Sequence, residues 1–568
     1  MKIMKFTKLS CLVLLLILAL LLLSGCTKVK PQDQTDAKDN LDDSTNANLN
    51  NDLSNNLQSA AVQLDNNISA ADPEKENPAE DNQSEILNTA QKKEILIGIE
   101  YAMPGIAKEF SKLGIPAVKY YPDAIAWDNM QPSETSEINF KVMDNFVTEF
   151  QEAGFTDLVV ALKSRSKWAE KGLFNPTPKK EFVDAYKKWV SSVVERYDLD
   201  GDEDMPSLKY PVKYYEIGTE FSSYEPETAE EYLEMLESAY TAAHSASDKV
   251  IVLHAAFLVT TAFKDNPSAE QYESAFNEVD QRIMTHSYSD IKKILDKPEF
   301  FDAINFHSLG DFYEIENTMQ WLNYEMNKRN YKKSIIISDT LVNSFIGQGI
   351  ATKCTGTGQG ILIKPVTEAD KCRLATYFNN LIGENKETLG WTYKYHASDI
   401  VKRVIIAAEQ NVELINIAST EDFDLLKSKI MQASAGTSAW SGMSEVSFNI
   451  ATQQRTVKSL RPSFFALQQL ASSIKGYSNV EKIPVLDNHE IKLYKFTINS
   501  KPVWIAWLET GKLILPEDVI PETTFTLDAS SALTVEQMQT SSSKDAKQIS
   551  PENGKVSIKL TPYPVYVW

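Results

Sequence analysis

Two carboxylate residues stand at the ends of short apolar runs that lie far apart in the chain. Glu220 closes the run 214–220, and Asp339 closes the run 335–339. If both runs are strands of one parallel barrel, their carboxyl ends meet on the same face, where barrel active sites lie. Two carboxyl groups facing one cavity could carry out glycoside hydrolysis, one as acid/base and one as nucleophile or base. Alternatively, each carboxylate only caps the helix that follows its strand.

The elements that must position these residues repeat a strand and then a helix. Between short apolar runs, apolar residues at helical spacing predict helices, for example over 140–150 before Gly154 and over 182–197. This alternation predicts an α/β fold, either a (β/α)8 TIM barrel or an open doubly wound sheet. No Gly-rich phosphate loop follows the first run, which favours the barrel. The eight predicted strands are 94–99, 117–121, 157–162, 213–217, 250–253, 302–306, 334–338 and 412–417.

The last hundred residues change from helical to alternating periodicity. A final helix is predicted from Arg461 to about Gly476, and the runs 493–497, 503–507 and 562–568 have the pattern of strands. We therefore predict a barrel over 94–476 and a small C-terminal antiparallel β-sandwich over 477–568.

The N-terminus has the pattern of an export signal. Three lysines within the first eight residues precede an apolar run over 11–23, which is too short to cross a bilayer. The sequence 23–26, Leu-Ser-Gly-Cys, resembles the lipobox of bacterial lipoproteins. That resemblance implies a signal peptide over 1–25, lipid attachment at Cys26 and a location on the extracytoplasmic face of the cell membrane. The alternative is an uncleaved membrane anchor.

The segment 26–93 is rich in Asn, Asp, Gln and Ser, and it lacks Gly and aromatic residues. Such a composition cannot bury enough apolar surface to fold, so we expect a disordered tether. The whole chain has 57 Lys and Arg against 78 Asp and Glu, a formal net charge of −21. This acidic balance argues against nucleic acid as a partner.

The predicted barrel resembles the retaining glycoside hydrolases of clan A, which are (β/α)8 barrels. The run 209–220 is similar to their fourth-strand motif, which ends in the acid/base Glu, here Glu220. The run 302–307 is similar to the sixth strand, whose His, here His307, lies near substrate. The run 334–339 corresponds to the seventh strand, which would make Asp339 the nucleophile. Trp127 and Trp168 occupy places where the clan carries aromatic residues, and 561–567 resembles the last strand of their accessory β domains.

Three positions depart from the clan's pattern. Thr219 replaces the Asn that binds the sugar 2-hydroxyl, and Leu309 stands where a Tyr often supports the nucleophile, a role that Tyr313 could take. Asp339 replaces Glu, and its shorter side chain is expected to move the carboxyl pair toward the inverting separation or toward inactivity.

Further candidates are aromatic residues and one histidine. Trp127, Trp168, Trp391 and Trp440 could stack on sugar rings, although most Trp residues in a barrel of this size belong to the core. His254 follows the fifth strand and could line the cleft, but a buried, hydrogen-bonded histidine is the more common case.

Two more motifs have open interpretations. Cys354 and Cys372 are the only cysteines left after processing and could form a disulfide in an exported protein. The acidic stretch 198–204 resembles a calcium loop, but an EF-hand loop counted from Asp198 would need Gly at 203 and Glu at 209, where Glu203 and Lys209 stand. A solvated acidic turn is the simpler interpretation, with bound calcium as the alternative; no metal or cofactor is otherwise implied.

These observations support one leading hypothesis. The chain is expected to be a lipid-anchored extracytoplasmic glycoside hydrolase-like protein that acts on a carbohydrate, with Glu220 as acid/base and Asp339 as nucleophile or base. One alternative is a catalytically inactive barrel that binds carbohydrate at the cell surface, and another is a structural lipoprotein of the cell surface, which would have no open cleft. A separation of the two carboxyls beyond about 10 Å would favour binding, and a separation in the range of known glycosidases would favour catalysis.

Overall fold

A computed structural model describes residues 94–172, 175–222, 227–259, 261–279, 286–341, 367–424, 427, 436–449, 452 and 454–568. The described residues all belong to one compact unit, Gln91–Trp568. The predicted signal, the tether, Cys26 and Cys354 lie outside the described residues. Within those residues, no helix combines the length and the apolar character needed to cross a bilayer.

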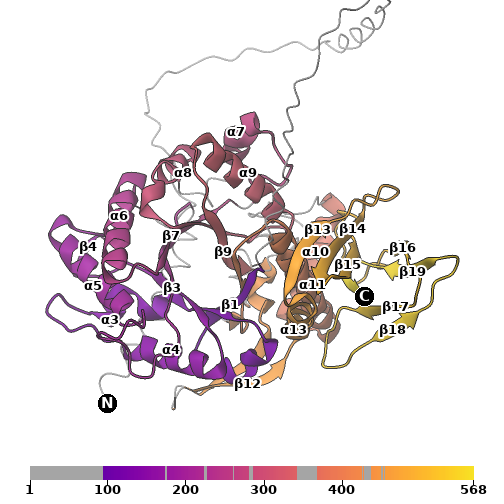
Figure 1. The fold of residues 1–568 in the computed structure, drawn as a ribbon, viewed down its shortest axis with the longest axis horizontal. Helices are drawn as coiled ribbons and strands as arrows, with labels where there is room; N and C mark the ends of the chain where they lie inside the picture. The colour runs from indigo at the N-terminus through magenta and orange to yellow at the C-terminus, as the bar shows by residue number, and fades with distance from the viewer. Residues whose placement is uncertain are drawn as a thin grey trace, which may run out of the picture. The chain divides into compact units, whose positions relative to one another are not determined.

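Eight parallel strands close into a barrel, which confirms the (β/α)8 prediction and excludes the open sheet (Figure 1). Each predicted strand overlaps an observed one. In spatial order the strands are β1, β10, β9, β8, β7, β6, β3 and β2. Their bounds are β1 Leu96–Ala102, β2 Ala117–Tyr120, β3 Asp157–Leu162, β6 Tyr214–Glu220, β7 Ile251–Leu258, β8 Ala303–His307, β9 Ser334–Leu341 and β10 Leu414–Ala418.

Helices follow the strands and bury apolar residues against the barrel. In α4 (Lys141–Ala153) the buried residues include Met143, Phe146 and Phe150, and Gly154 ends the helix with a φ of 106°. A capping box of Thr228 and Glu231 starts α6. The other helices include α5 Val183–Glu195, α6 Ala229–Ala246, α7 Tyr272–Asn277, α8 Tyr288–Leu295, α9 Glu314–Lys328, α10 Glu368–Ile382, α11 Lys386–Glu409 and α13 Pro462–Ile474.

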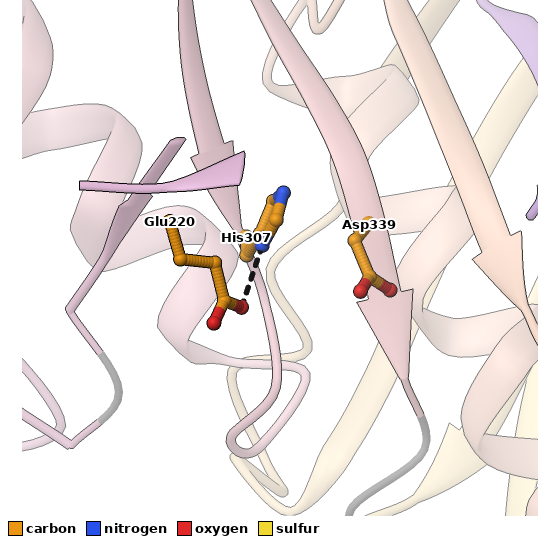
Figure 2. A group of neighbouring side chains, drawn as sticks. All are labelled: Glu220, His307 and Asp339. Atoms are coloured by element: carbon orange, nitrogen blue, oxygen red, sulfur yellow. Dashed lines mark hydrogen bonds and ion pairs between the residues drawn. The ribbon is translucent and has the colours of Figure 1, made fainter. Parts of the chain in front are cut away.

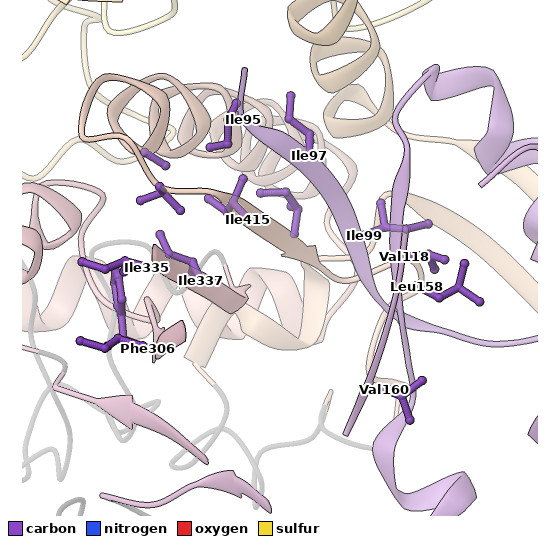
Figure 3. Packing of buried hydrophobic residues seen from close by; sticks show 14 of the residues in the cluster. Ile95, Ile97, Ile99, Val118, Leu158, Val160, Phe306, Ile335, Ile337 and Ile415 are labelled. Carbon is purple, nitrogen blue, oxygen red and sulfur yellow. The ribbon is translucent and has the colours of Figure 1, made fainter. Parts of the chain in front are cut away.

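The barrel interior has an apolar layer and a polar layer. Near the amino ends of the strands, residues such as Val159, Leu253 and Ile336 form a separate small cluster. Two positions further along the strands, polar residues occupy the interior instead, among them Lys119, Glu216, Asn305, Ser338 and Asn416, all buried. The alternate strand residues belong to the large cluster shown in part in Figure 3.

Gly98 of β1 makes room for this polar layer. A Cβ at Gly98 would lie 2.1 Å from Oδ1 of Asn416 on the neighbouring strand β10. Any larger residue would therefore require the side chain of Asn416 to shift.

The C-terminal part is an antiparallel sandwich, as predicted. Its six-stranded sheet comprises β13 Tyr477–Lys482, β14 Ile491–Ile498, β15 Lys501–Leu508, β20 Val565–Val567, β17 Leu533–Gln537 and β18 Ala546–Ile549, in this order. A second sheet pairs β16 (Thr523–Asp528) with β19 (Lys555–Leu560). Leu493, Ala506 and Ile558 share the cluster of the sandwich, whereas Tyr494 and Trp507 belong to the large cluster of the barrel. The sheet thus packs on both faces.

Two hairpins were not predicted from the sequence. One pairs β4 (Glu170–Gly172) with β5 (Asn175–Pro178) after β3, and the other pairs β11 (Ser444–Asn449) with β12 (Gln454–Leu460) before α13.

Candidate active site

The two predicted carboxylates meet at the carboxyl end of the barrel. Glu220 is the last residue of β6, His307 is the last residue of β8, and Asp339 lies near the end of β9. All three side chains are buried and lie close together (Figure 2). One carboxylate oxygen of Glu220, one of Asp339 and a ring nitrogen of His307 lie within 4.8 Å of one another.

This separation differs from the expectation for Asp339. The nearest oxygens of the pair lie within 4.8 Å of each other, which is below the roughly 6.5–9.5 Å typical of inverting enzymes and nearer to the roughly 5–5.5 Å of retaining ones. The shorter Asp side chain therefore does not open the pair to the inverting distance.

A bulge in β9 explains how Asp339 reaches the interior. Ile337 pairs with Phe306 and Asp339 pairs with His307, so β9 carries one extra residue, Ser338, at this point. In a regular strand Asp339 would share the outward face of Ile337, because successive side chains alternate. The bulge turns both Ser338 and Asp339 inward, a common way to re-aim a side chain next to an active site.

His307 links the two sides of the site. Its Nδ1 lies 2.8 Å from Oε1 of Glu220, and its Nε2 lies 2.9 Å from Oγ of Ser338. Burial alone would lower the pKa of His307, but hydrogen bonds and charges from Glu216 and Glu220 raise it to about 9. At neutral pH the imidazole is therefore a cation that donates to Glu220. A protonated ring has no free lone pair, which disfavours a metal ion shared by Glu220, His307 and Asp339.

A buried ion network lies beneath the pair and was not predicted. The Lys119 ammonium on β2 is 2.8 Å from Oε1 of Glu100 and 2.8 Å from Oε2 of Glu216, and it also donates to the carbonyl of Ser338 at 3.2 Å. Despite complete burial, Lys119 and His307 lower the pKa of Glu216 to about 2. The clues in the sequence were Glu100, Lys119 and Glu216, charged residues within or directly after three short apolar runs.

Glu100 behaves differently from Glu216. Burial is the main cause that raises the pKa of Glu100 well above its usual range, and the negative charge of Asp339 is the second. Oε2 of Glu100 and Oδ1 of Asp339 are both buried and, within the described residues, accept no hydrogen bond. A proton on Glu100 that faces Asp339 would give both oxygens a partner.

Tyr101 on β1, not Tyr313, supports Asp339. The Tyr101 hydroxyl donates to Oδ2 of Asp339 at 3.0 Å, and Tyr101 adopts a positive φ of 55°. Tyr313 instead lies at the start of α9, where its ring centroid is 5.8 Å from Nζ of Lys492 on β14. The sequence-based role of Tyr313 at the site is therefore wrong.

The tryptophans predicted to stack on sugars belong largely to the core. Trp127 is fully buried, its ring packs on Trp168 and Trp189, and its Nε1 donates to Oε1 of Gln131. Trp168 is half-buried, and its Nε1 donates to the carbonyl of Gln131. Other aromatic residues enclose the Trp127 ring, and Trp168 packs edge-on against Trp127 and Phe182.

The remaining candidates are placed as follows. Thr219 is half-buried on β6 beside Glu220, and Trp440 is buried, whereas Trp391 is half-buried and stacks on Tyr395. His254 is a core residue, as the simpler interpretation held: burial lowers its pKa to about 4, and its Nε2 accepts from the backbone N–H of Asn305. Cys372 is half-buried in α10, and its pairing with Cys354 stays a prediction.

Comparisons with known proteins give similarity in fold only. No protein-family profile matches the chain, and no curated protein matches it by sequence. Among solved structures, the chain is similar to a GH30 endoxylanase from Clostridium papyrosolvens C71, with 10% identity, a TM-score of 0.46 and coverage of 84% of this chain and 96% of that one. It is also similar to a glucosidase from Croceicoccus marinus, with 10% identity, a TM-score of 0.47 and coverage of 84% of this chain and 96% of that one. A monomeric β-xylosidase from Caulobacter crescentus CB15 is similar with 11% identity, a TM-score of 0.47 and coverage of 84% of this chain and 97% of that one. At these identities and TM-scores, the likeness adds nothing to the argument on function, which rests on the site itself.

Proposed function

We propose that this protein is a retaining glycoside hydrolase in which Glu220 is the acid/base and Asp339 is the nucleophile. The observation that carries the proposal is the approach of their oxygens within 4.8 Å at the carboxyl end of a closed barrel. The same separation argues against the alternative of a barrel that only binds carbohydrate, because that alternative needs no paired carboxyls.

The reaction would proceed in two steps. Asp339 attacks the anomeric carbon of the sugar while Glu220 gives a proton to the departing glycosidic oxygen, which leaves as an alcohol. Glu220, now a carboxylate, takes a proton from water, and the resulting hydroxide attacks the anomeric carbon and releases Asp339.

The neighbouring residues fit these two roles. The hydrogen bond from Tyr101 holds the Asp339 carboxylate in a fixed orientation for nucleophilic attack. The His307 cation stabilises the carboxylate that Glu220 becomes when it gives up its proton.

The test is a screen of polysaccharides and aryl glycosides, followed by NMR of the first-formed anomer of any product. We expect net retention of configuration. Glu220→Gln and Asp339→Asn should each lower kcat by about 10³-fold or more. The exposed control Asp184→Asn should leave kcat unchanged. Net inversion, or binding of glycans without hydrolysis, would contradict the proposal.

The same proposal includes a lipid anchor at the outer face of the membrane. It is supported by the basic residues, the apolar run 11–23 and Cys26 of the sequence. Mass spectrometry of the mature N-terminus should find a diacylglycerol-modified Cys26, and Cys26→Ser should leave the protein unprocessed and unlipidated. An unmodified, uncleaved N-terminus in the wild type would argue for the simple membrane anchor instead.

A further inference from the structure

The acidic stretch 198–204 lies at the opposite end of the barrel from the carboxyl pair. It joins α5 to β6, the strand whose last residue is Glu220. Loops that lead from a helix into a barrel strand lie at the amino ends of the strands, away from the active-site face. A ligand bound there would act on how the chain enters β6 and would not touch the sugar.

Three carboxylates of this loop converge on one point. One oxygen each of Asp198, Asp200 and Asp204 lies within 4.8 Å of the other two. Asp204 also closes the loop, because its two oxygens accept from the backbone N–H groups of Leu199 at 3.0 Å and Gly201 at 2.8 Å. The convergence is therefore part of the folded loop.

Asp198 is the observation that points beyond a solvated turn. Its side chain is only 4% exposed, and its Oδ1 is buried without a hydrogen-bond donor among the described residues. The hydroxyl of Ser247 and the backbone of Asp200 also contact this carboxylate, but they leave Oδ1 without a donor. A buried carboxylate oxygen without a partner costs free energy unless a cation reaches it.

Among the described residues, no side-chain cation pairs with these carboxylates. In the part of the chain that the structure describes, no ion pair within 4.0 Å involves Asp198, Asp200 or Asp204. Arg196, two residues away, is instead bound to Asp144 through two hydrogen bonds of 2.9 and 2.8 Å. Burial and the surrounding carboxylates of Asp198 and Asp200 also raise the pKa of Glu195. The loop thus concentrates negative charge beside a buried, unsatisfied acceptor.

We propose that Asp198, Asp200 and Asp204 bind one Ca²⁺ ion, which fixes the entry into β6. Calcium takes oxygen ligands at roughly 2.3–2.6 Å, so two of its ligands can be up to about 4.6–5.2 Å apart. The three oxygens here lie within 4.8 Å of one another, close enough to share one such ion. The ligand shell of Ca²⁺ is also more tolerant than that of Mg²⁺, which demands near-ideal octahedral geometry and usually keeps several waters. The site is not an EF-hand, because Glu203 and Lys209 replace the Gly and Glu that such a loop requires.

Isothermal titration of CaCl₂ into the full-length chain, freed of metal with EGTA and kept in mild detergent, tests this site. We expect one Ca²⁺ per chain with a Kd between about 10⁻⁶ and 10⁻³ M, and a higher Tm with Ca²⁺ than with EGTA. Asp198→Asn and Asp200→Asn should each weaken binding by about tenfold or more, because the charge of the ligand set controls the affinity. Asp200 is exposed, so its variant stays informative if Asp198→Asn folds poorly.

The matched control is Asp202→Asn, which removes the same charge from an exposed residue of the same loop outside the three. It should change the Kd by less than about twofold. Either of two results would overturn the proposal: the wild type shows no saturable Ca²⁺ binding up to about 10 mM, well above the range of extracellular calcium sites, or Asp202→Asn weakens binding as much as Asp198→Asn, which would show a diffuse attraction to the acidic loop.

Discussion

The carboxyl pair and the acidic loop both gather carboxylates, but they treat the charge in opposite ways. Around Glu220 and Asp339 the barrel supplies two buried cations, Lys119 and His307. In the loop, by contrast, the described residues offer Asp198, Asp200 and Asp204 no ion pair. The upper cluster, Glu220 and Asp339 with Glu100, Lys119, Glu216 and His307, includes the last residue of β6. The lower cluster, Asp198, Asp200 and Asp204, lies in the loop that leads into β6.

The difference shows what each cluster requires. The cations of the upper cluster are fixed by the fold, so its carboxylates can keep the defined protonation states that acid/base chemistry needs. The negative charge of the lower cluster calls for a cation from solution. Replacing one charged residue of the upper cluster by a neutral one should therefore lower the free energy of unfolding of the protein. In the absence of metal, the same kind of replacement in the lower cluster should raise it.

The largest effect is expected for Lys119→Met. This change leaves Glu100 and Glu216 buried without their cation, and such a loss costs about 3–5 kcal/mol of the free energy of unfolding. Urea denaturation followed by circular dichroism measures it. The double variant Lys119→Met/Glu216→Gln should recover part of the loss, and the exposed control Lys180→Met should lose less than about 0.5 kcal/mol. A loss below about 1 kcal/mol for Lys119→Met would mean that Lys119 does not compensate the charges of Glu100 and Glu216.

A smaller effect is expected from the titration of His307. Its pKa is about 9 in the folded protein, above the ordinary value of 6.5. The stabilisation from its charge is therefore complete below about pH 6.5 and is lost as the pH rises through 9, by up to about 3 kcal/mol. Unfolding measured between pH 6 and 10 should show this fall, and His307→Gln should remove it. The exposed control His489→Gln should leave the pH dependence unchanged; a flat wild-type profile would show that His307 is neutral.

Tyr101→Phe should have a more modest effect on turnover. The variant removes only the hydroxyl that donates to Asp339, and one hydrogen bond to a charged group contributes about 1.5–3 kcal/mol. We expect kcat to fall about tenfold or more with little change in KM. The control Tyr210→Phe changes an exposed tyrosine far along the chain. Unchanged turnover would assign Tyr101 to structure alone.

Local patterns in the sequence were enough to predict the barrel strands and both carboxylates. Each strand is a short apolar run, and Glu220 and Asp339 close two of them, so their shared face follows from the barrel rule alone. Glu220 and His307 also lie where the resemblance to clan A placed them.

The surroundings of the pair depend on contacts between strands that no local pattern records. The inward turn of Asp339 comes from a bulge in the pairing of β9 with β8, and Lys119 meets Glu216 only when β2 and β6 close around β3. Trp127 was misplaced because Gln131 satisfies its indole N–H, which allows the whole ring to be buried. Tyr101 was overlooked because its support of Asp339 comes from β1 and not from the loop after β8.

The smallest expected effect is the change in stability caused by Asp198→Asn, and its sign should differ between EGTA and Ca²⁺. In EGTA, Asp198→Asn should raise the free energy of unfolding by about 0.5–1 kcal/mol, since it removes one of three converging charges and its amide can donate to Asp200 or Asp204. The raised pKa of Asp198 gives the same sign, because a carboxyl that resists ionisation in the folded state destabilises that state at neutral pH. In saturating Ca²⁺ the same variant should be less stable than the wild type, because it has lost a ligand.

Glu216→Gln in the upper cluster should destabilise the protein under both conditions, since Lys119 and His307 depend on its charge. If Asp198→Asn lowers stability equally in EGTA and in Ca²⁺, the loop is a compensated cluster like the upper one, and the contrast between the two ends of β6 fails.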